Sequence, residues 1–495
     1  MLFNSYIFIF AFLPITFFIY FYLNKKRLTE ASKGFLVFSS LFFYSWWNII
    51  YLPIILSSIL FNYLIGSILS KSSEGEKKFR KRSVLLFGII LNILLLAYFK
   101  YSDFFIENIN FIANAQIDLL KLTLPLAISF FTFQQIAYLV DSYRGETKEY
   151  DFLNYSLFVT FFPQLIAGPI VHHKEMMSQF TTKKNKIINY TNISLGLFIF
   201  SIGLFKKVVI ADTFAVWATA GFDTAETLNL IEAWATSLSY TFQLYFDFSG
   251  YADMAIGAAL LFNIKLPINF NSPYKALNIQ DFWKRWHITL SRFLRDYIYI
   301  PLGGNRKGSM RTYNNLLATF IIGGIWHGAG WTFIFWGLLH GLALVMHRAW
   351  QFLGYKMNSV LAWFITFNFI NIAWVFFRAR NWDDAIKVLS SMFDLSNIVL
   401  TEKLTNKLVF LSEYGIIFSN VTEHIGDGSK VLNWIIGGFI LILIFKNSNQ
   451  KVVSSTLTNV NSLTVIHAVY FAILFMFSIL YMSMSTYTEF IYFNF

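Results

Sequence analysis

The chain has 495 residues and contains no cysteine. This absence excludes a disulfide, a thiolate metal site and a thiol nucleophile. The sequence also lacks the HExxH pattern of zinc hydrolases and the GxxxxGK[ST] loop that binds nucleotide phosphates. Because no histidine has a carboxylate pair beside it at ligand spacing, we expect no metal site and no bound cofactor.

Charge is scarce, since 13% of the residues are charged while 56% are hydrophobic and 20% are aromatic. A soluble domain is typically about 25% charged. A membrane-spanning helix needs about 20 apolar residues. Apolar runs near that length recur along the chain, so we predict an all-α polytopic membrane protein with about ten or more transmembrane helices. The runs are residues 6–23, 34–51, 53–69, 84–99, 124–140, 195–210, 316–346, 360–377, 431–445 and 465–481.

Positive charge is concentrated in two loops, at Lys25 to Arg27 and at residues 71–82. Cytoplasmic loops of membrane proteins carry an excess of Lys and Arg. We therefore predict that both loops face the cytoplasm and that the N-terminus lies outside. The first residues, "MLFNSY", carry no positive charge, so we expect a retained span and not a signal peptide. The net charge of +12 follows from this loop bias and predicts no binding of nucleic acid.

The hydrophobic pattern breaks at residues 263–311, which are basic and aromatic. Asn278 can cap a helix there, and Asp281 favours the positive end of its dipole. We predict one amphipathic helix that ends at Pro301, with a single apolar face made by Trp283, Trp286, Leu290, Phe293 and Tyr297.

The charges of this helix admit two interpretations. Asp281 with Arg285, and Arg292 with Asp296, are spaced as i,i+4 ion pairs. The helix can lie at the cytoplasmic surface, with its cations facing lipid phosphates. Alternatively, Lys284, Arg285 and Arg295 face a polyanionic substrate in the cytosol.

Two other segments place polar groups in apolar surroundings. Asp247 and Asp253 lie among aromatic residues, and a carboxylate in mid-membrane costs about 2.5–3.5 kcal/mol. We expect both to pair with cations of the following segment and to stabilise the fold. Residues 161–173, "FFPQLIAGPIVHH", contain two prolines and a glycine, which predicts a broken or re-entrant helix.

His327 lies in "GGIWHGAG", within the apolar run 316–346. The glycines around it let other helices or a ligand approach the backbone closely. A neutral histidine is much less costly to bury than a carboxylate, and its reference pKa of about 6.5 suits general-base catalysis. In a continuous helix His340 would point about 140° away, so we do not expect it to assist His327. A hydrogen-bonded packing role for His327 is the alternative.

Six motifs occur in an order that resembles the membrane-bound O-acyltransferases, especially the bacterial branch of alginate and peptidoglycan O-acetylation. They are "SFFTFQQIAYLVDSYRG" (129–145), "FPQLIAGPI" (162–170), "YFDFSGYADMAIG" (245–257), "NFNSPY" (269–274), "DFWKRWHITLSRFLRDYIYIPLGGN" (281–305) and "GGIWHGAGWTFIFWGLLHG" (323–341). The resemblance implies one membrane domain over 1–495, with N-terminal helices (1–122), a catalytic core (123–347) and C-terminal helices (348–495).

By this resemblance His327 is the catalytic histidine and His287 occupies the second polar position of the active site. His287 is expected to orient the thioester or to stabilise the oxyanion. The expected substrate-binding residues are Trp283, Lys284, Arg285, Trp286, Arg295, Trp326, Asn269 and Ser272.

The resemblance further implies a multi-pass protein of the bacterial inner membrane that moves acetyl from cytosolic acetyl-CoA, the donor substrate, to an extracytoplasmic acceptor. A periplasmic acetyltransferase of the serine-hydrolase type would then acetylate a cell-envelope polysaccharide. The composition, rich in Ile, Asn, Phe and Lys, is typical of AT-rich genomes and favours peptidoglycan over alginate. The alternatives are a transporter or flippase for an acetylated or lipid-linked precursor, and a binding module of a polymer export complex. A transporter would be expected to have pseudo-symmetric halves, which the sequence does not show.

Overall fold

A computed structural model of the chain describes residues 1–71, 78–147, 149, 151–448, 465–484 and 491. Helices dominate these residues, and the two strands among them have three residues each. The prediction of a helical protein is therefore confirmed. The chain forms two compact units, each described separately below, whereas the predicted boundaries at residues 122 and 347 stay predictions. The first unit comprises Met1–Leu204, Tyr251–Ile268 and Lys451–Phe475, and the second Phe205–Gly250, Asn269–Gln450 and Met476–Phe495.

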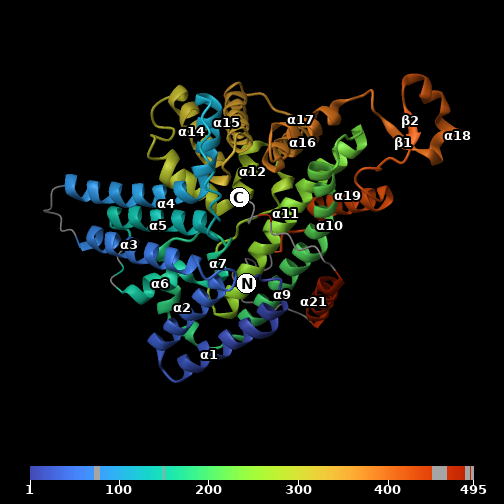
Figure 1. Cartoon of the computed structure of the whole chain (residues 1–495). Helices are drawn as coiled ribbons and strands as arrows, with labels where there is room; N and C mark the ends of the chain where they lie inside the picture. Colours follow the sequence, from blue (N-terminus) through green and yellow to red (C-terminus); the bar gives the residue numbers. More distant parts are fainter. Residues whose placement is uncertain (72–77, 148, 150, 449–464, 485–490, 492–495) are drawn as a thin grey trace. The chain divides into compact units, whose positions relative to one another are not determined.

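The first unit contains a layer in which α5 packs against both α3 and α4 (Figure 1). Its motif at residues 161–173 is broken, as predicted: α6 ends at Thr160, and α8 begins only at His173. A Cβ on Gly168 would lie 2.4 Å from the Cα of Gln164, so this turn requires glycine. The helices of this part of the chain are η1 (Phe8–Phe12), α1 (Leu13–Lys25), α2 (Thr29–Ser45), α3 (Tyr51–Lys71), α4 (Lys78–Ala113), α5 (Ile128–Arg144), α6 (Phe152–Thr160), α7 (Phe162–Leu165), α8 (His173–Thr181), η2 (Lys183–Lys186) and α9 (Tyr190–Phe205).

The second unit carries most of the residues with candidate chemistry. The long helix α11 contributes to both units, as does α21. Two short parallel strands, β1 and β2, pair Val399 with Ile417. The remaining elements are η3 (Lys206–Ala211), α10 (Asp212–Thr219), η4 (Ala220–Thr224), α11 (Leu230–Leu261), η5 (Pro273–Lys275), α12 (Ile279–Arg285), α13 (Ile288–Leu294), η6 (Arg295–Tyr299), α14 (Ser309–His327), α15 (Trp331–Phe352), α16 (Ser359–Arg378), α17 (Trp382–Phe393), β1 (Val399–Thr401), η7 (Glu402–Leu404), α18 (Thr405–Leu408), η8 (Val409–Tyr414), β2 (Ile417–Ser419), α19 (Gly428–Leu443) and α21 (Val465–Met484).

The apolar run 316–346 is not one helix, because the chain leaves the helical conformation after His327 and α15 begins at Trp331. The helices α14 and α15 then pack closely against each other. A Cβ on Gly324 would lie 2.3 Å from the carbonyl oxygen of Phe333, and one on Gly337 would lie 2.4 Å from that of Phe320. Small residues therefore allow the two backbones to approach.

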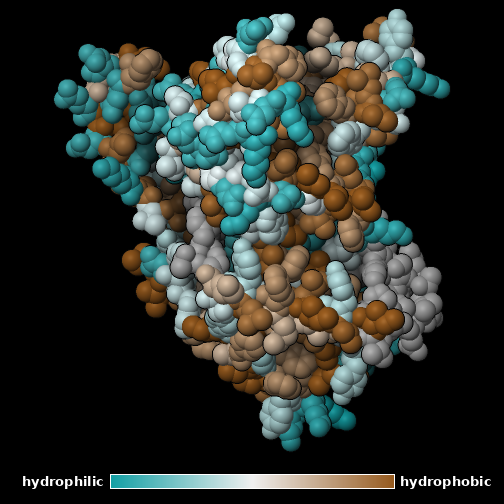
Figure 2. Space-filling model, turned by 90° about the vertical axis from the view of Figure 1, so that its right-hand side faces the viewer, coloured by the Kyte–Doolittle hydropathy of each residue, from teal (hydrophilic) through white to brown (hydrophobic). Residues whose placement is uncertain are grey.

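Six helical segments of the described chain are long and apolar enough to cross a membrane, and α19 and residues 468–484 are shorter apolar helices. The structure thus supports several spans but does not confirm ten or more. Large apolar side chains are widely exposed, and Figure 2 shows extended apolar areas on one face of the molecule. Such surfaces are typical of contact with lipid. The six segments are Phe8–Lys25, Tyr51–Lys71, Arg80–Ala113, Tyr190–Thr224, Trp331–Phe352 and Ser359–Arg378.

Asp247 forms a buried ion pair, but its partner is not in the following segment. The Nζ atom of Lys207, which lies earlier in the chain, is 2.7 Å from Oδ1 of Asp247 and 2.6 Å from Oδ1 of Asp212. All three side chains are at most 4% exposed. The predicted structural role of Asp247 therefore has a physical basis, whereas the predicted location of its cation is wrong. The pairing of Asp253 stays a prediction.

Candidate functional site

The basic segment forms two short helices and not the single predicted helix. Asn278 caps α12 as expected, since its Oδ1 accepts a hydrogen bond from the amide of Asp281 at 2.8 Å. The helix ends at Arg285, and His287 adopts a left-handed conformation with φ of 42°. The amide of Ile288 donates to the carbonyl of Asn269 at 3.0 Å, which ties this turn to the NFNSPY motif. The apolar periodicity could not reveal a break that depends on this distant segment.

His287 is completely buried at this break. Its ring packs edge-on against Phe248 of α11, with 4.7 Å between the ring centroids. A non-glycine residue with positive φ is strained by roughly 1–3 kcal/mol, and such strain concentrates at functional sites. The turn thus holds the imidazole in one orientation, although the strain does not by itself identify a role.

The hydrogen bonds of Asn269 determine the tautomer of His287. Oδ1 of Asn269 accepts from the amide of Thr289 at 3.1 Å, and it lies 3.2 Å from Nδ1 of His287. An oxygen that accepts from an amide cannot donate, so Nδ1 of His287 must carry the proton. Nε2 then presents a lone pair, and it has no hydrogen-bond partner among the described residues. Burial lowers the pKa of His287 to about 3, which keeps the ring neutral at ordinary pH.

His327 is the last residue of α14, and its side chain is enclosed by aromatic rings. The centroids of Trp326, Trp336 and Phe377 lie 4.8, 5.1 and 5.1 Å from that of His327. Trp326 also contacts the ring of His287, with a centroid distance of 6.4 Å. The structure therefore places both predicted catalytic histidines beside one tryptophan.

His340 does not contact His327 directly among the described contacts, but both pack against Trp336. Nδ1 of His340 accepts a hydrogen bond from the indole of Trp283 at 3.2 Å. His340 is fully buried. Its role in the structure is to hold Trp283 in place.

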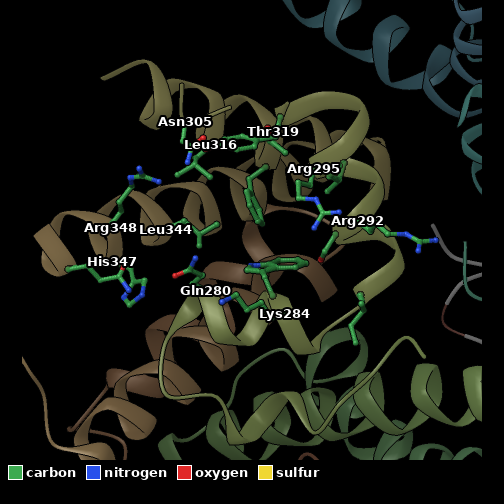
Figure 3. Close-up of a pocket in the computed structure, with 17 residues that line it drawn as sticks. Gln280, Lys284, Arg292, Arg295, Asn305, Leu316, Thr319, Leu344, His347 and Arg348 are labelled. Carbon is green, nitrogen blue, oxygen red and sulfur yellow. The ribbon is translucent and has the colours of Figure 1, made fainter. Parts of the chain in front are cut away.

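Trp283 lines a cavity of about 570 Å³ in the second unit (Figure 3). This is the size of a typical small-molecule site. Lys284 and Arg295 line it as well, so the structure brings together two of the three predicted substrate-binding cations. Trp283 also packs against Trp336, at 5.9 Å between ring centroids, so one aromatic layer connects the cavity wall with the surroundings of His327.

The other five predicted substrate-binding residues do not line this cavity, and two of them, Asn269 and Trp326, lie beside His287 as described above. Arg285 instead donates to Asp281 at 2.9 Å, in the predicted i,i+4 ion pair. Trp286 is buried, with its ring 5.0 Å from that of Trp374. Ser272 precedes η5 with a φ of 48°. These positions favour structural roles for Arg285, Trp286 and Ser272.

The sequence reasoning missed three basic residues of the cavity, namely Arg292, His347 and Arg348. Arg292 is predicted above as an ion-pair partner of Asp296, and the structure places Nε of Arg295 2.7 Å from Oδ1 of the same carboxylate. His347 and Arg348 lie near the end of α15, in another motif. The change from apolar to basic residues at the end of this span could have marked His347 and Arg348 as candidates. Only the tertiary structure shows that they lie in the same cavity as Lys284.

Comparisons with known proteins show what the whole chain is similar to. The model of the membrane-bound O-acyltransferase family matches residues 41–381. A peptidoglycan O-acetyltransferase of Helicobacter pylori is 51% identical, over 100% of this chain and 98% of its own length. A probable alginate O-acetylase of Pseudomonas aeruginosa is 39% identical, over 81% and 76% of the two chains. A teichoic acid D-alanyltransferase of Bacillus subtilis is 26% identical, over 52% and 69%.

Proposed function

The chain belongs to the membrane-bound O-acyltransferase family and is an acyltransferase, and we propose that it moves acetyl from cytosolic acetyl-CoA across the bacterial inner membrane. The acceptor is an extracytoplasmic hydroxyl, and the product serves the O-acetylation of peptidoglycan. The full-length similarity to a peptidoglycan O-acetyltransferase supports this acceptor over alginate. The observation that carries the proposal is the placement of His327 and His287 against Trp326, with a basic cavity behind the adjoining aromatic layer.

In the proposed mechanism the oxygen of the acceptor hydroxyl attacks the thioester carbonyl while His327 accepts the proton of that hydroxyl. The carbon–sulfur bond then breaks, acetyl remains on the oxygen, and the CoA sulfur takes up the proton from His327. General-base catalysis of this kind typically contributes about 10²–10⁴-fold. The aromatic rings around His327 exclude water, which would otherwise hydrolyse the thioester.

His287 has a different task in this mechanism. The attacking hydroxyl gives its single proton to His327, so the Nε2 lone pair of His287 can accept a hydrogen bond only from another donor group of the acceptor. The neutral ring has no N–H at Nε2 to donate to an oxyanion. The tautomer therefore favours an orienting role over oxyanion stabilisation. The acetyl group then passes to a periplasmic partner of the serine-hydrolase type, which places it on the polysaccharide.

The test is acetyl transfer from labelled acetyl-CoA by purified His327→Ala and His327→Gln variants. We expect both to lose at least about 100-fold in turnover while unfolding at the wild-type temperature. His424→Gln is a matched control, since His424 is partly exposed and pairs with Glu232 outside this site. If a folded His327→Ala protein retains near wild-type transfer, the assignment is wrong. If no histidine matters for transfer but polymer acetylation in cells still requires the protein, the transporter interpretation replaces it.

A further inference from the structure

A second cavity lies in the first unit between α3 and α4, in the layer where α5 packs against both helices (Figure 1). Its volume is about 500 Å³, and its lining comes from residues 53–61 of α3 and residues 91–99 of α4. Most of the lining side chains are apolar, and no charged residue is among the described residues that line it. A charged ligand would lose its hydration here without gaining a partner, so the cavity favours an apolar ligand.

The helices pack closely on one side of this cavity, beyond residue 61 of α3. A Cβ on Gly66 would lie 2.3 Å from the ring of Tyr138, and one on Gly88 would lie 2.8 Å from the side chain of Leu139 and 3.1 Å from that of Ile65. Small residues therefore let α3 and α4 approach at this end. The cavity is bounded by a close helix contact and is not a sign of loose packing along the whole of α3.

The buried polar residues of the lining are Ser58 and Asn92, and both bind other protein groups. Nδ2 of Asn92 donates to Oδ1 of Asn62 at 2.7 Å and to the carbonyl of Gly88 at 2.8 Å, which uses both of its hydrogens. Oγ of Ser58 accepts a hydrogen bond from Nε2 of Gln135 at 3.1 Å. A buried water needs about two to four polar partners, which these occupied groups do not supply. The cavity therefore favours a ligand that needs no hydrogen bonds.

The surface around the cavity is apolar as well. Both α3 and α4 belong to segments that are long and apolar enough to cross a membrane. Near the cavity the large side chains of Leu60, Ile90 and Leu94 are exposed on these helices. Exposed apolar surface on a spanning segment contacts the acyl chains of the bilayer. The cavity is therefore continuous with a surface that lipid covers.

The position of the cavity along the helices corresponds to one leaflet of the bilayer. Trp46 and Trp47 are exposed directly before α3, and tryptophan is enriched at the membrane–water interface. From residue 53 to residue 61 the cavity extends about 12 Å, at a rise of about 1.5 Å per residue. One leaflet contributes about 15 Å to a hydrocarbon core of about 30 Å. The cavity thus runs from just below the interface toward the middle of the membrane.

We propose that this cavity binds one acyl chain of a membrane phospholipid. The chain lies along α3 and α4, with its methyl end near the amide pair of Asn62 and Asn92 and its ester end near the first turn of α3. The basic segment 71–82 lies at the other end of both helices, so the lipid belongs to the outer leaflet in the predicted orientation. Because no charged residue lines the cavity, the site recognises the chain and not the headgroup. The bound chain fills the space between the two helices and stabilises the first unit.

The experiment counts the phospholipids that remain on the full-length protein after purification in a mild detergent, by native mass spectrometry. Ser57→Trp places a large side chain in the cavity, since Ser57 lines it. Leu60→Trp is the matched control, because Leu60 is exposed on the same helix but does not line the cavity. We expect Ser57→Trp to lose one phospholipid per protein that the wild-type protein and Leu60→Trp both retain. If Ser57→Trp does not fold, Leu95→Phe tests the same space from α4 and should show the same loss.

Thermal unfolding gives a second measurement on the same proteins. A ligand that binds only the folded state raises the Tm. Added phosphatidylglycerol should therefore raise the Tm of delipidated wild-type protein and of Leu60→Trp, but not that of Ser57→Trp. A long isoprenoid phosphate, which differs in the chain, should have no such effect on the wild-type protein.

Three results would overturn the proposal. Equal phospholipid counts in Ser57→Trp and Leu60→Trp, with equal Tm responses, would show that the cavity holds no acyl chain. Equal loss of lipid from both variants would show that the retained lipid covers the surface and does not enter the cavity. A Tm response to the isoprenoid phosphate and not to phosphatidylglycerol would assign the cavity to a different lipid class. Acetyl transfer is not measured in these experiments, so a failure of the proposed function would leave their outcome unchanged.

Discussion

At the scale of single residues, the structure separates two histidines that look alike in the sequence. His287 and His340 are both fully buried, but their hydrogen bonds differ. Asn269 accepts from Nδ1 of His287, whereas Nδ1 of His340 itself accepts from Trp283. The ring of His287 therefore presents a lone pair at Nε2, whereas the neutral ring of His340 presents an N–H at Nε2. His340→Ala should thus lower the Tm of the protein by freeing Trp283.

The buried His287 should make the protein sensitive to acid. Its pKa of about 3 lies below the ordinary value of 6.5, so the unfolded chain binds more protons between these pH values. The stabilisation is fully present above pH 6.5 and is lost as the pH falls toward 3. At pH 5 the loss is about 2 kcal/mol. Thermal unfolding in detergent should therefore show a smaller decrease in Tm from pH 7 to pH 5 for His287→Asn than for the wild-type protein. Equal decreases in the two proteins would contradict the burial of a neutral ring.

At the scale of helices, contacts between elements that are distant in sequence hold the second unit together. Lys207 of η3 pairs with Asp247 of α11, and Asn269 of the NFNSPY motif accepts a hydrogen bond from the turn at His287. Glycines let α14 and α15 approach closely. The bond between Asn269 and Ile288 joins two of the six motifs, which gives a structural reason for their occurrence together.

Removing one member of the buried ion pair should destabilise the fold before it affects catalysis. Asp247→Asn removes one of the two carboxylates that balance the buried positive charge of Lys207. Breaking a buried ion pair typically costs about 3–5 kcal/mol. The partly exposed pair of Asp281 and Arg285 is the control, since ion pairs near the surface contribute about 0–1 kcal/mol. Tm and turnover of Asp247→Asn and Asp281→Asn should be measured on the same preparations. A stable but inactive Asp247→Asn protein would place this carboxylate in the active site.

The packing of α14 against α15 predicts different effects for two glycine substitutions. A methyl group on Gly337 would overlap the carbonyl of Phe320, so Gly337→Ala must separate the helices and should cost about 1–3 kcal/mol. Gly437 in α19 has no atom within 4 Å of an added Cβ, and Gly437→Ala should be neutral or slightly stabilising. The readout is Tm together with acetyl transfer. Comparable Tm values for the two variants would argue against the close approach of α14 and α15.

At the scale of the whole molecule, the distribution of charge predicts the orientation in the membrane. The absence of cysteine allows this to be tested with single cysteines and no background labelling. Lys26 and Gln116 are both exposed, Lys26 in the first basic loop and Gln116 in the segment between α4 and α5. A membrane-impermeant maleimide should label Gln116→Cys in intact cells and Lys26→Cys only after the membrane is permeabilised, because Lys26 belongs to a basic loop. The reverse pattern would invert the predicted orientation, including the cytosolic access of CoA.

The sequence by itself determined the class of the protein, because hydrophobicity and charge are properties of composition and act along the whole chain. It also determined the family, since the family follows from local motifs, and those motifs predicted the role of His327. It could predict the cap at Asn278 and the break near Pro163, which depend on residues close in sequence.

The tertiary structure alone decided which distant residues meet. The apolar periodicity of residues 281–297 predicted one helix, but pairing with Asn269 imposes the turn at His287. The carboxylate of Asp247 required a cation, yet several Lys and Arg residues could have supplied it before the fold selected Lys207. Arg348 joined the basic cavity because α15 packs beside α12. These outcomes depend on contacts between segments far apart in the chain, and local sequence patterns carry no information about such distances.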